Sequence, residues 1–233
     1  MEPLKYKKEI NLIYKTEKKG PQKIFGLNFV KENINNIELI INGVKSPLIE
    51  EYDLEEGINN IKLIIKNDLI NLGYMFHECS TLYNIDELKY LNTSNCKNFS
   101  NIFFMCSSLS DIKALEQWNV SKGTDFSFML SMSNISDIKP LENWDVSNAI
   151  DFEHMLSCCH LLTDLKPLKK WDVSNVTNFK SMFFNCSSLS DIKPLENWNI
   201  SKGTDFSEMF GLCTKLIDKS SLEKWKLLNK NFK

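Results

Sequence analysis

The sequence predicts an α/β solenoid of about six 27-residue coils, each a short strand plus a short helix, preceded by a small mostly-β capping module. Two observations support this fold class. Tryptophans recur 26, 27, 27 and 27 residues apart, at Trp118, Trp144, Trp171, Trp198 and Trp225, and the segments between them align with almost no gaps. Residues 1–66 lack the repeat, so we predict two domains, 1–66 and 67–233.

The N-terminal module is predicted to be mostly β because β-branched and aromatic residues alternate with polar ones. The predicted strands cover residues 9–16, 22–29, 37–41, 44–48 and 60–66, with a short helix possible at 29–33. Asn42-Gly43 is typical of a hairpin turn between two of them. We expect a β-grasp-like or sandwich layout that covers the first coil, whose apolar end would otherwise be exposed.

Each repeat is predicted to contain one helix, one strand and one helical turn. In the best copy Phe179, Met182, Phe183 and Cys186 fall at i, i+3, i+4 and i+7, which indicates one face of a short helix. The Leu-Ser-Asp-Ile segment that follows is predicted to be a strand, and Pro-Leu-Glu-Asn-Trp a helical turn. Stacked coils would bury these columns, and charged residues in 224–230 predict a polar closure of the last coil.

The repeat pattern resembles a known family. It is W-(D/N)-V-S-N-V-T-N-F-x-x-M-F-x-x-C-S-S-L, over about 160 residues. It is similar to the BspA-like leucine-rich repeats of bacterial and protist surface proteins, also known as mycoplasma-lipoprotein-type repeats. The resemblance implies a curved leucine-rich-repeat solenoid with a role in binding or adhesion and no catalytic chemistry.

Two charged columns form the candidate partner-binding face. They comprise Asp111, Lys113, Asp137, Lys139, Asp164, Lys166, Asp191 and Lys193. With Ile192 facing inward on a strand, its charged neighbours would face outward, and diagonal attraction to lysine would offset repulsion between stacked aspartates. The face is either a solvated, charge-balanced surface or a surface for a protein partner. A calcium site would need a glycine-rich loop, which the sequence lacks, so we predict no metal.

The tryptophan column is predicted to be structural core, with a carbohydrate platform or cation trap as the alternative. The cysteines that recur once per coil are predicted to be reduced core thiols, with metal ligation or disulfides as alternatives. His77, His154 and His160 fall in different columns and are expected to be isolated surface residues. No nucleophile and base are suitably spaced, so we predict a non-enzyme without cofactors.

Composition narrows the partners and the location. All 28 basic residues are lysine, and the net charge is -2, which argues against nucleic acid. No apolar run is long enough to cross a bilayer, so we predict no membrane insertion. The start of the chain lacks a secretory signal, and an odd count of seven cysteines favours the cytosol. Seven N-x-S/T sequons, several in predicted turns, would risk glycans on a eukaryotic secretory route.

We therefore expect other proteins as partners and no small-molecule substrate. The leading hypothesis is an intracellular interaction module or scaffold built into a larger assembly, such as a cytoskeletal or ciliary complex. The alternative is a surface-displayed adhesion protein, which applies if a signal peptide is missing from this chain. Richness in lysine, asparagine and isoleucine suggests a protist source.

Overall fold

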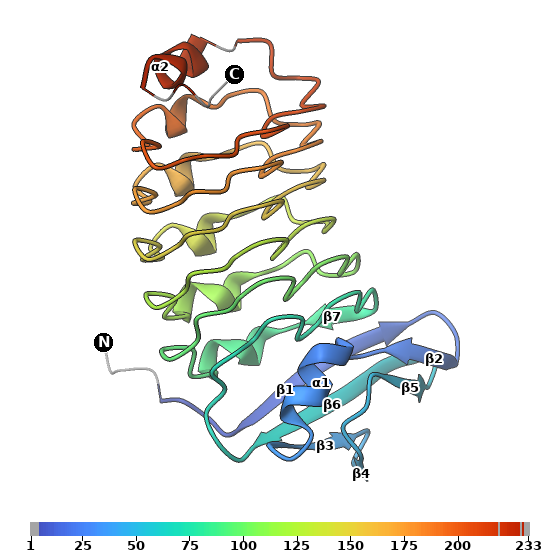
Figure 1. The fold of residues 1–233 in the computed structure, drawn as a ribbon. Coiled ribbons are helices and arrows are strands. Elements are labelled where there is room, and N and C mark those ends of the chain that lie inside the picture. The colour runs from blue at the N-terminus through green and yellow to red at the C-terminus, as the bar shows by residue number, and fades with distance from the viewer. Residues whose placement is uncertain (1–4, 219, 229, 231–233) are drawn as a thin grey trace.

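The computed structural model describes residues 5–218, 220–228 and 230 (Figure 1). Its N-terminal part holds a five-stranded antiparallel sheet of order β4-β3-β6-β1-β7 and a two-stranded sheet of β2 and β5. The strands are β1 (Glu9–Thr16), β2 (Gly20–Lys23), β3 (Ile37–Ile41), β4 (Val44–Ser46), β5 (Glu51–Leu54), β6 (Gly57–Ile65) and β7 (Leu82–Asn84). Helix α1 (Leu27–Asn33) follows β2.

Alternating side chains explain this sheet. In β1 Ile10, Leu12 and Tyr14 are fully buried. Of the residues between them, Asn11 is exposed and Ile13 is partly exposed. Asn42 and Gly43 have φ angles of 48° and 86°, the left-handed pair that a two-residue hairpin between β3 and β4 requires. Strands β1 and β3 occupy their predicted ranges, whereas the predicted strand 22–29 is wrong because β2 ends at Lys23 and α1 begins at Leu27.

The first repeat is attached to the N-terminal sheet. Its strand β7 pairs with β1, and the Gly26 N–H donates to the Met75 carbonyl at 3.2 Å. Phe25 packs against Phe29 of α1 and against Phe76 of the first repeat, with ring centroids 5.9 and 6.0 Å apart. The hydrophobic core is therefore continuous from the sheet into the repeats.

The predicted fold class, an α/β leucine-rich-repeat solenoid of strand-plus-helix coils, is wrong. Regular structure in the described residues is mostly β, with α1 and α2 (Ser220–Leu228) as the two α-helices. The repeats, which lie one above another in Figure 1, consist mainly of turns. Beyond β7 their regular elements are short 3-10 helices: η1 (Asp86–Tyr90), η2 (Lys113–Gln117), η3 (Lys139–Leu141), η4 (Lys166–Leu168) and η5 (Lys193–Leu195).

The expected repeat helix is replaced by two consecutive turns. Ser181 and Asn185 have φ angles of 53° and 56°, and such left-handed residues interrupt an α-helix. The N–H groups of Met182 and Cys186 donate to carbonyls three residues back, at 3.1 and 3.2 Å, which closes the two turns. Turns that repeat every four residues bury Phe179, Met182, Phe183 and Cys186 just as a helix face would.

Neighbouring repeats are joined through these turns by a row of backbone hydrogen bonds that we call the donor ladder. Between the last two repeats the bonds are 2.7–2.9 Å long; the donors are the N–H groups of Phe179, Ser181, Phe183 and Asn185, and the acceptors the carbonyls of Asp205, Ser207, Met209 and Gly211. The same pattern joins each earlier pair of repeats, always with the N–H pointing toward the C-terminal end.

The predicted Leu-x-x-Ile strands form once, as β7 in the first copy. There β1 lies alongside and accepts the pairing. In the later copies Leu189 and Ile192 are buried, but no backbone ladder joins their segment to a neighbouring repeat among the described residues. A strand is defined by its partner, so burial alone does not make one.

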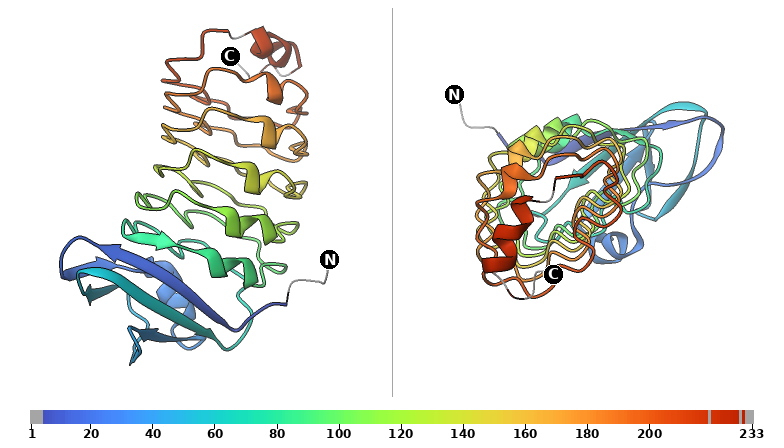
Figure 2. Two further views of the ribbon diagram at one scale, coloured as in Figure 1. Left: turned by 180° about the vertical axis from the view of Figure 1, so that it is seen from behind. Right: turned by 90° about the horizontal axis from the view of Figure 1, so that it is seen from above.

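Helix α2 lies over part of the last repeat, as Figure 2 shows. Its Trp225 stacks on Trp198 at 6.2 Å, and Leu222 is also buried. The predicted polar closure, residues 224–230, falls largely within this helix, with exposed Lys226 and Leu227, while Asn229 lies outside the described residues.

Candidate functional site

The charged columns lie at a corner that each repeat forms in the same way. A carboxylate Oδ1 accepts the backbone N–H of the lysine two residues on, at 2.8–2.9 Å; the pairs are Asp111 with Lys113, Asp137 with Lys139, Asp164 with Lys166 and Asp191 with Lys193. A short 3-10 helix begins at each lysine, and the apolar residue between is buried. These are Asx turns, so the aspartate starts the corner while its second oxygen stays available.

Charge compensation at this corner is local. Lys166 Nζ lies 3.8 Å from Asp164 Oδ2 of its own turn, and the described part of these two columns contains no closer pair. The predicted diagonal attraction between repeats required a pleated sheet surface, which the corner does not have. The lysine side chains remain exposed to solvent.

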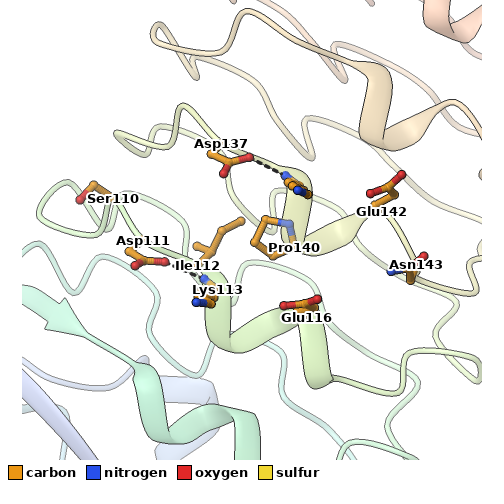
Figure 3. Close-up of a pocket in the computed structure, with 10 residues that line it drawn as sticks. Ser110, Asp111, Ile112, Lys113, Glu116, Asp137, Pro140, Glu142 and Asn143 are labelled. Carbon is orange, nitrogen blue, oxygen red and sulfur yellow. Dashed lines mark hydrogen bonds between the residues drawn. The ribbon is translucent and has the colours of Figure 1, made fainter.

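Successive corners enclose grooves between repeats. One groove, of about 640 Å³, contains Asp111, Lys113, Asp137 and Lys139 (Figure 3). A second, of about 260 Å³, shares Asp137 and Lys139 and adds Asp164 and Lys166. Asp191 and Lys193 lie one repeat further on, outside both grooves. The structure thus brings six of the eight predicted residues to one continuous polar surface.

Two further carboxylates line these grooves that sequence reasoning missed. Glu116 belongs to the first groove, and Glu142 to both. Both follow the buried leucine of the 3-10 helix, and Glu196 occupies the same position in a later copy. That column could have been found from the repeat alignment. With these residues the two grooves carry five carboxylates against three lysines, so the surface is acidic.

The tryptophan column lies inside the molecule. All five indoles are 5% exposed or less, and Trp144 stacks almost parallel on Trp171 at 6.4 Å. Each of the first four also donates its Nε1–H to a leucine carbonyl of the preceding repeat at 2.9–3.0 Å, the acceptors being Leu88, Leu115, Leu141 and Leu168. These indoles are packed and hydrogen-bonded and do not form an open ligand platform.

The cysteine column is buried in the same way. All seven cysteines are free thiols, and only Cys158 is partly exposed. Cys186 Sγ lies 3.1 Å from the Leu156 carbonyl of the preceding repeat, and Cys106 and Cys213 make the same contact. Burial raises the pKa of the Cys159 thiol to about 11 and that of Cys96 to about 12. Such thiols stay neutral and are poor nucleophiles and poor metal ligands.

Two of the histidines lie in a half-buried aromatic row beside the donor ladder. His77 stacks on Phe104 at 5.1 Å and His154 on Phe128 at 4.6 Å, while His160 is exposed. Burial lowers the pKa of both stacked imidazoles. Across the described residues, no cluster of three or more His, Cys, Asp or Glu side chains is arranged to hold a metal ion.

Comparison with known proteins places the chain in a family. The model of the family described as Mycoplasma protein of unknown function, DUF285, matches residues 53–163 and again residues 131–232. These matches cover more than half of the chain, so the protein belongs to this family. Neither curated proteins nor solved structures gave a significant match. In the part that the structure describes, no helix has the length and apolarity needed to span a membrane.

Proposed function

We propose that this protein is a non-catalytic interaction module or scaffold that binds another protein through the acidic grooves at the Asp-x-Lys corners. The observation that carries the proposal is their continuity. Charged side chains from three successive repeats line one surface, and each turn that presents them is held by a backbone N–H that donates to the aspartate carboxylate. A rigid, repeated surface of this kind suits an extended partner with complementary positive charge.

Family membership gives the proposal its context. Members of the BspA-like repeat family carry the matched DUF285 model, which supports an assignment to BspA-like proteins. That resemblance implies binding and adhesion and does not by itself choose a cellular location. We place the protein inside the cell, as a structural component of a larger assembly, with surface display as the alternative.

Two sequon asparagines favour the intracellular version. Asn134 Nδ2 donates to the Ser107 carbonyl at 2.6 Å, and Asn175 Nδ2 donates to the Ser147 carbonyl at 2.7 Å. A glycan is attached at this same nitrogen, so modification would remove or crowd a contact between repeats. Fractionation and surface labelling of intact source cells test the location, and labelling of this chain on intact cells would overturn our choice.

The binding face is tested by removing charge without removing the turn. Asn84 already starts the equivalent corner by accepting the Asp86 N–H at 2.9 Å, so asparagine keeps the local geometry. We expect a crosslinking pull-down with the D137N/D164N variant to recover at least about tenfold less partner than one with the wild type. The reason is that desolvated interfacial charges contribute binding free energy on this scale.

The chain supplies a matched control. Asp145 and Asp172 start a different Asx corner of the same two repeats, where their Oδ1 atoms accept the N–H groups of Ser147 and Ser174. The variant D145N/D172N removes the same charge from another surface and should recover partners as the wild type does. Equal recovery by both variants, or equal loss by both, would refute the assignment of the binding face.

A further inference from the structure

One copy of the Asp-x-Lys corner differs in charge from its neighbours. The corner reads Asp-Ile-Lys-Pro-Leu-Glu-Asn in residues 137–143 and 191–197, and Asp-Ile-Lys-Ala-Leu-Glu-Gln in residues 111–117. Each of these three copies has two acidic residues and one lysine, which gives a net charge of -1. Residues 164–170, which we call the basic corner, read Asp-Leu-Lys-Pro-Leu-Lys-Lys and have one acidic residue and three lysines, which gives +2. The two lysines that end this copy account for the difference.

The backbone does not impose this change of charge. The residues that follow η3, η4 and η5 have φ angles of -57°, -54° and -56°, so the three short helices end in the same conformation. The Lys169 N–H donates to the Lys166 carbonyl at 3.1 Å, as the Glu142 N–H donates to the Lys139 carbonyl at 3.0 Å. Lys169 is therefore presented in the same way as Glu142 one repeat earlier, and the turn accepts either charge.

The basic corner lies where the acidic surface ends. Glu142 lines both grooves, and Asn143 lines the first groove (Figure 3). Lys169 and Lys170 occupy the same two positions one repeat further on, and Pro167 of their corner lines the second groove. Backbone hydrogen bonds join successive repeats, so the repeats lie about 4.8 Å apart. The surface thus changes from acidic to basic within about 5–10 Å, or one to two repeats.

Both lysines that end the basic corner are available to a partner. The side chains of Lys169 and Lys170 are exposed. In the part of the chain that the structure describes, neither ammonium lies within 4.0 Å of a carboxylate, whereas Lys166 of the same corner lies 3.8 Å from Asp164. A carboxylate of a partner could therefore pair with these two lysines without displacing an existing ion pair.

Charge complementarity decides which kind of segment fits this surface. A segment that is basic throughout would be attracted to the first groove and repelled by the basic corner, and like charges placed together at an interface lower affinity. A segment that is basic over the first groove and acidic about two to three residues further along would be attracted at both places. This spacing follows from the rise of an extended chain, about 3.3 Å per residue.

We propose that the occupant of the acidic grooves is a dipolar protein segment, whose basic side chains lie over the first groove and whose carboxylates bind Lys169 and Lys170. The inference rests on the function proposed for these grooves and specifies the order of charges in the partner. The grooves supply the attraction for the basic half of the segment. The basic corner supplies the selectivity, because it rejects segments that carry positive charge along their whole length.

The chain itself supplies the variant for the test. K169E/K170N gives the basic corner the Pro-Leu-Glu-Asn-Trp sequence of both neighbouring copies, so the fold accommodates it. This variant lowers the net charge by three. K122E/K202N lowers the net charge by the same amount at exposed positions of the Ser-Lys-Gly-Thr turns, away from the Asp-x-Lys corners, and is the matched control. Thermal melting of both variants verifies that the repeats remain folded.

Fluorescence anisotropy at low ionic strength compares two labelled peptides on the full chain. The dipolar peptide is Lys-Lys-Ser-Gly-Glu-Glu and the basic peptide is Lys-Lys-Ser-Gly-Lys-Lys. We expect the dipolar peptide to bind the wild type and K122E/K202N at least about tenfold more tightly than K169E/K170N, because that variant exchanges two attractions for a repulsion. The basic peptide should show the opposite change and bind K169E/K170N more tightly than either of the other two proteins.

The two peptides separate this inference from the proposed function. If the wild type binds the basic peptide, but the dipolar peptide has equal affinity for the wild type and K169E/K170N, the basic corner selects nothing and the grooves alone attract positive charge. An equal loss of dipolar binding in both variants would also overturn the inference, because overall charge would then control affinity. If neither peptide binds the wild type, the function proposed for the acidic grooves is itself wrong.

Discussion

At the scale of single residues, most of the recurring tryptophans and cysteines combine burial with one polar contact to the neighbouring repeat. The indole N–H of Trp171 binds the Leu141 carbonyl at 3.0 Å, and Cys159 Sγ lies 3.3 Å from the Leu130 carbonyl. Apolar surface supplies most of the stabilisation, and the polar contact sets the register between repeats. The columns were therefore predictable from spacing, while the carbonyl partners were not.

Trp171→Ala should destabilise the protein severely. The substitution removes a ring that is 4% exposed and packs between Trp144 and Phe152, and such losses cost about 3–5 kcal/mol. Chemical denaturation measures the loss. Trp171→Phe keeps an aromatic ring but deletes the indole donor, so it should fall between the wild type and the alanine variant. A normal melting curve for Trp171→Ala would show that this indole is not core.

Stability should fall as the pH rises from about 9 to about 11. Cys159 ionises near its ordinary pKa of 9.0 when unfolded but at a pKa of about 11 when folded, because burial disfavours the thiolate. Below pH 9 both states hold the proton and the folded protein keeps its full stability; above it, the unfolded state gains by losing the proton. This thiol accounts for about 2 kcal/mol over that window.

Denaturation curves at pH 8 and pH 10.5 measure this dependence. Cys159→Ala should show a smaller fall between the two pH values than the wild type, while variants at partly exposed Cys158 serve as the comparison. An identical fall in the wild type and in Cys159→Ala would contradict a buried, protonated thiol.

At the scale of elements, Asx turns and left-handed turn residues take the place of strand and helix. Asp191 Oδ1 accepts the Lys193 N–H where η5 begins, and Asp205 Oδ1 accepts the Ser207 N–H where the donor ladder begins. These side chains satisfy backbone donors that a regular element would have paired internally. The aspartates at the corners therefore have a structural role in the turn, and only their remaining polar atoms are available for binding.

Asp191→Ala should lower stability by about 1 kcal/mol, the usual cost of losing a side chain that accepts from the start of a helical turn. Asp191→Asn should be nearly neutral because the amide oxygen can accept the same N–H. Thermal melting of the two variants makes the comparison. If both lose the same amount, the carboxylate acts through its charge and not through the turn.

At the scale of the whole molecule, the N-terminal sheet and the repeats share one core and act on each other through the first repeat. Gly26 lies directly against that repeat, since a Cβ added there would come within 2.1 Å of the Tyr74 carbonyl oxygen. In a stacked protein each unit is stabilised chiefly by its neighbours. A disturbance at Gly26 should therefore weaken nearby repeats more than distant ones.

Gly26→Ala tests this coupling. The added methyl must push the sheet away from the first repeat, so the amides of Tyr74 and Phe76 should exchange at least about tenfold faster than in the wild type. Ser181 and Phe183, four repeats away, should keep their rates. Uniform acceleration along the chain would instead indicate that the molecule opens as a single unit.

The sequence by itself determined the repeat, the buried columns and the exposed charged columns, because burial depends on spacing along the chain. Only the tertiary structure decided the backbone conformation between the buried residues. A four-residue turn and a 3.6-residue helix would both bury Phe179, Met182, Phe183 and Cys186. The hydrophobic pattern therefore does not reveal the left-handed φ angles at Ser181 and Asn185. Pairing likewise comes from a neighbour, since β7 is a strand because β1 lies beside it.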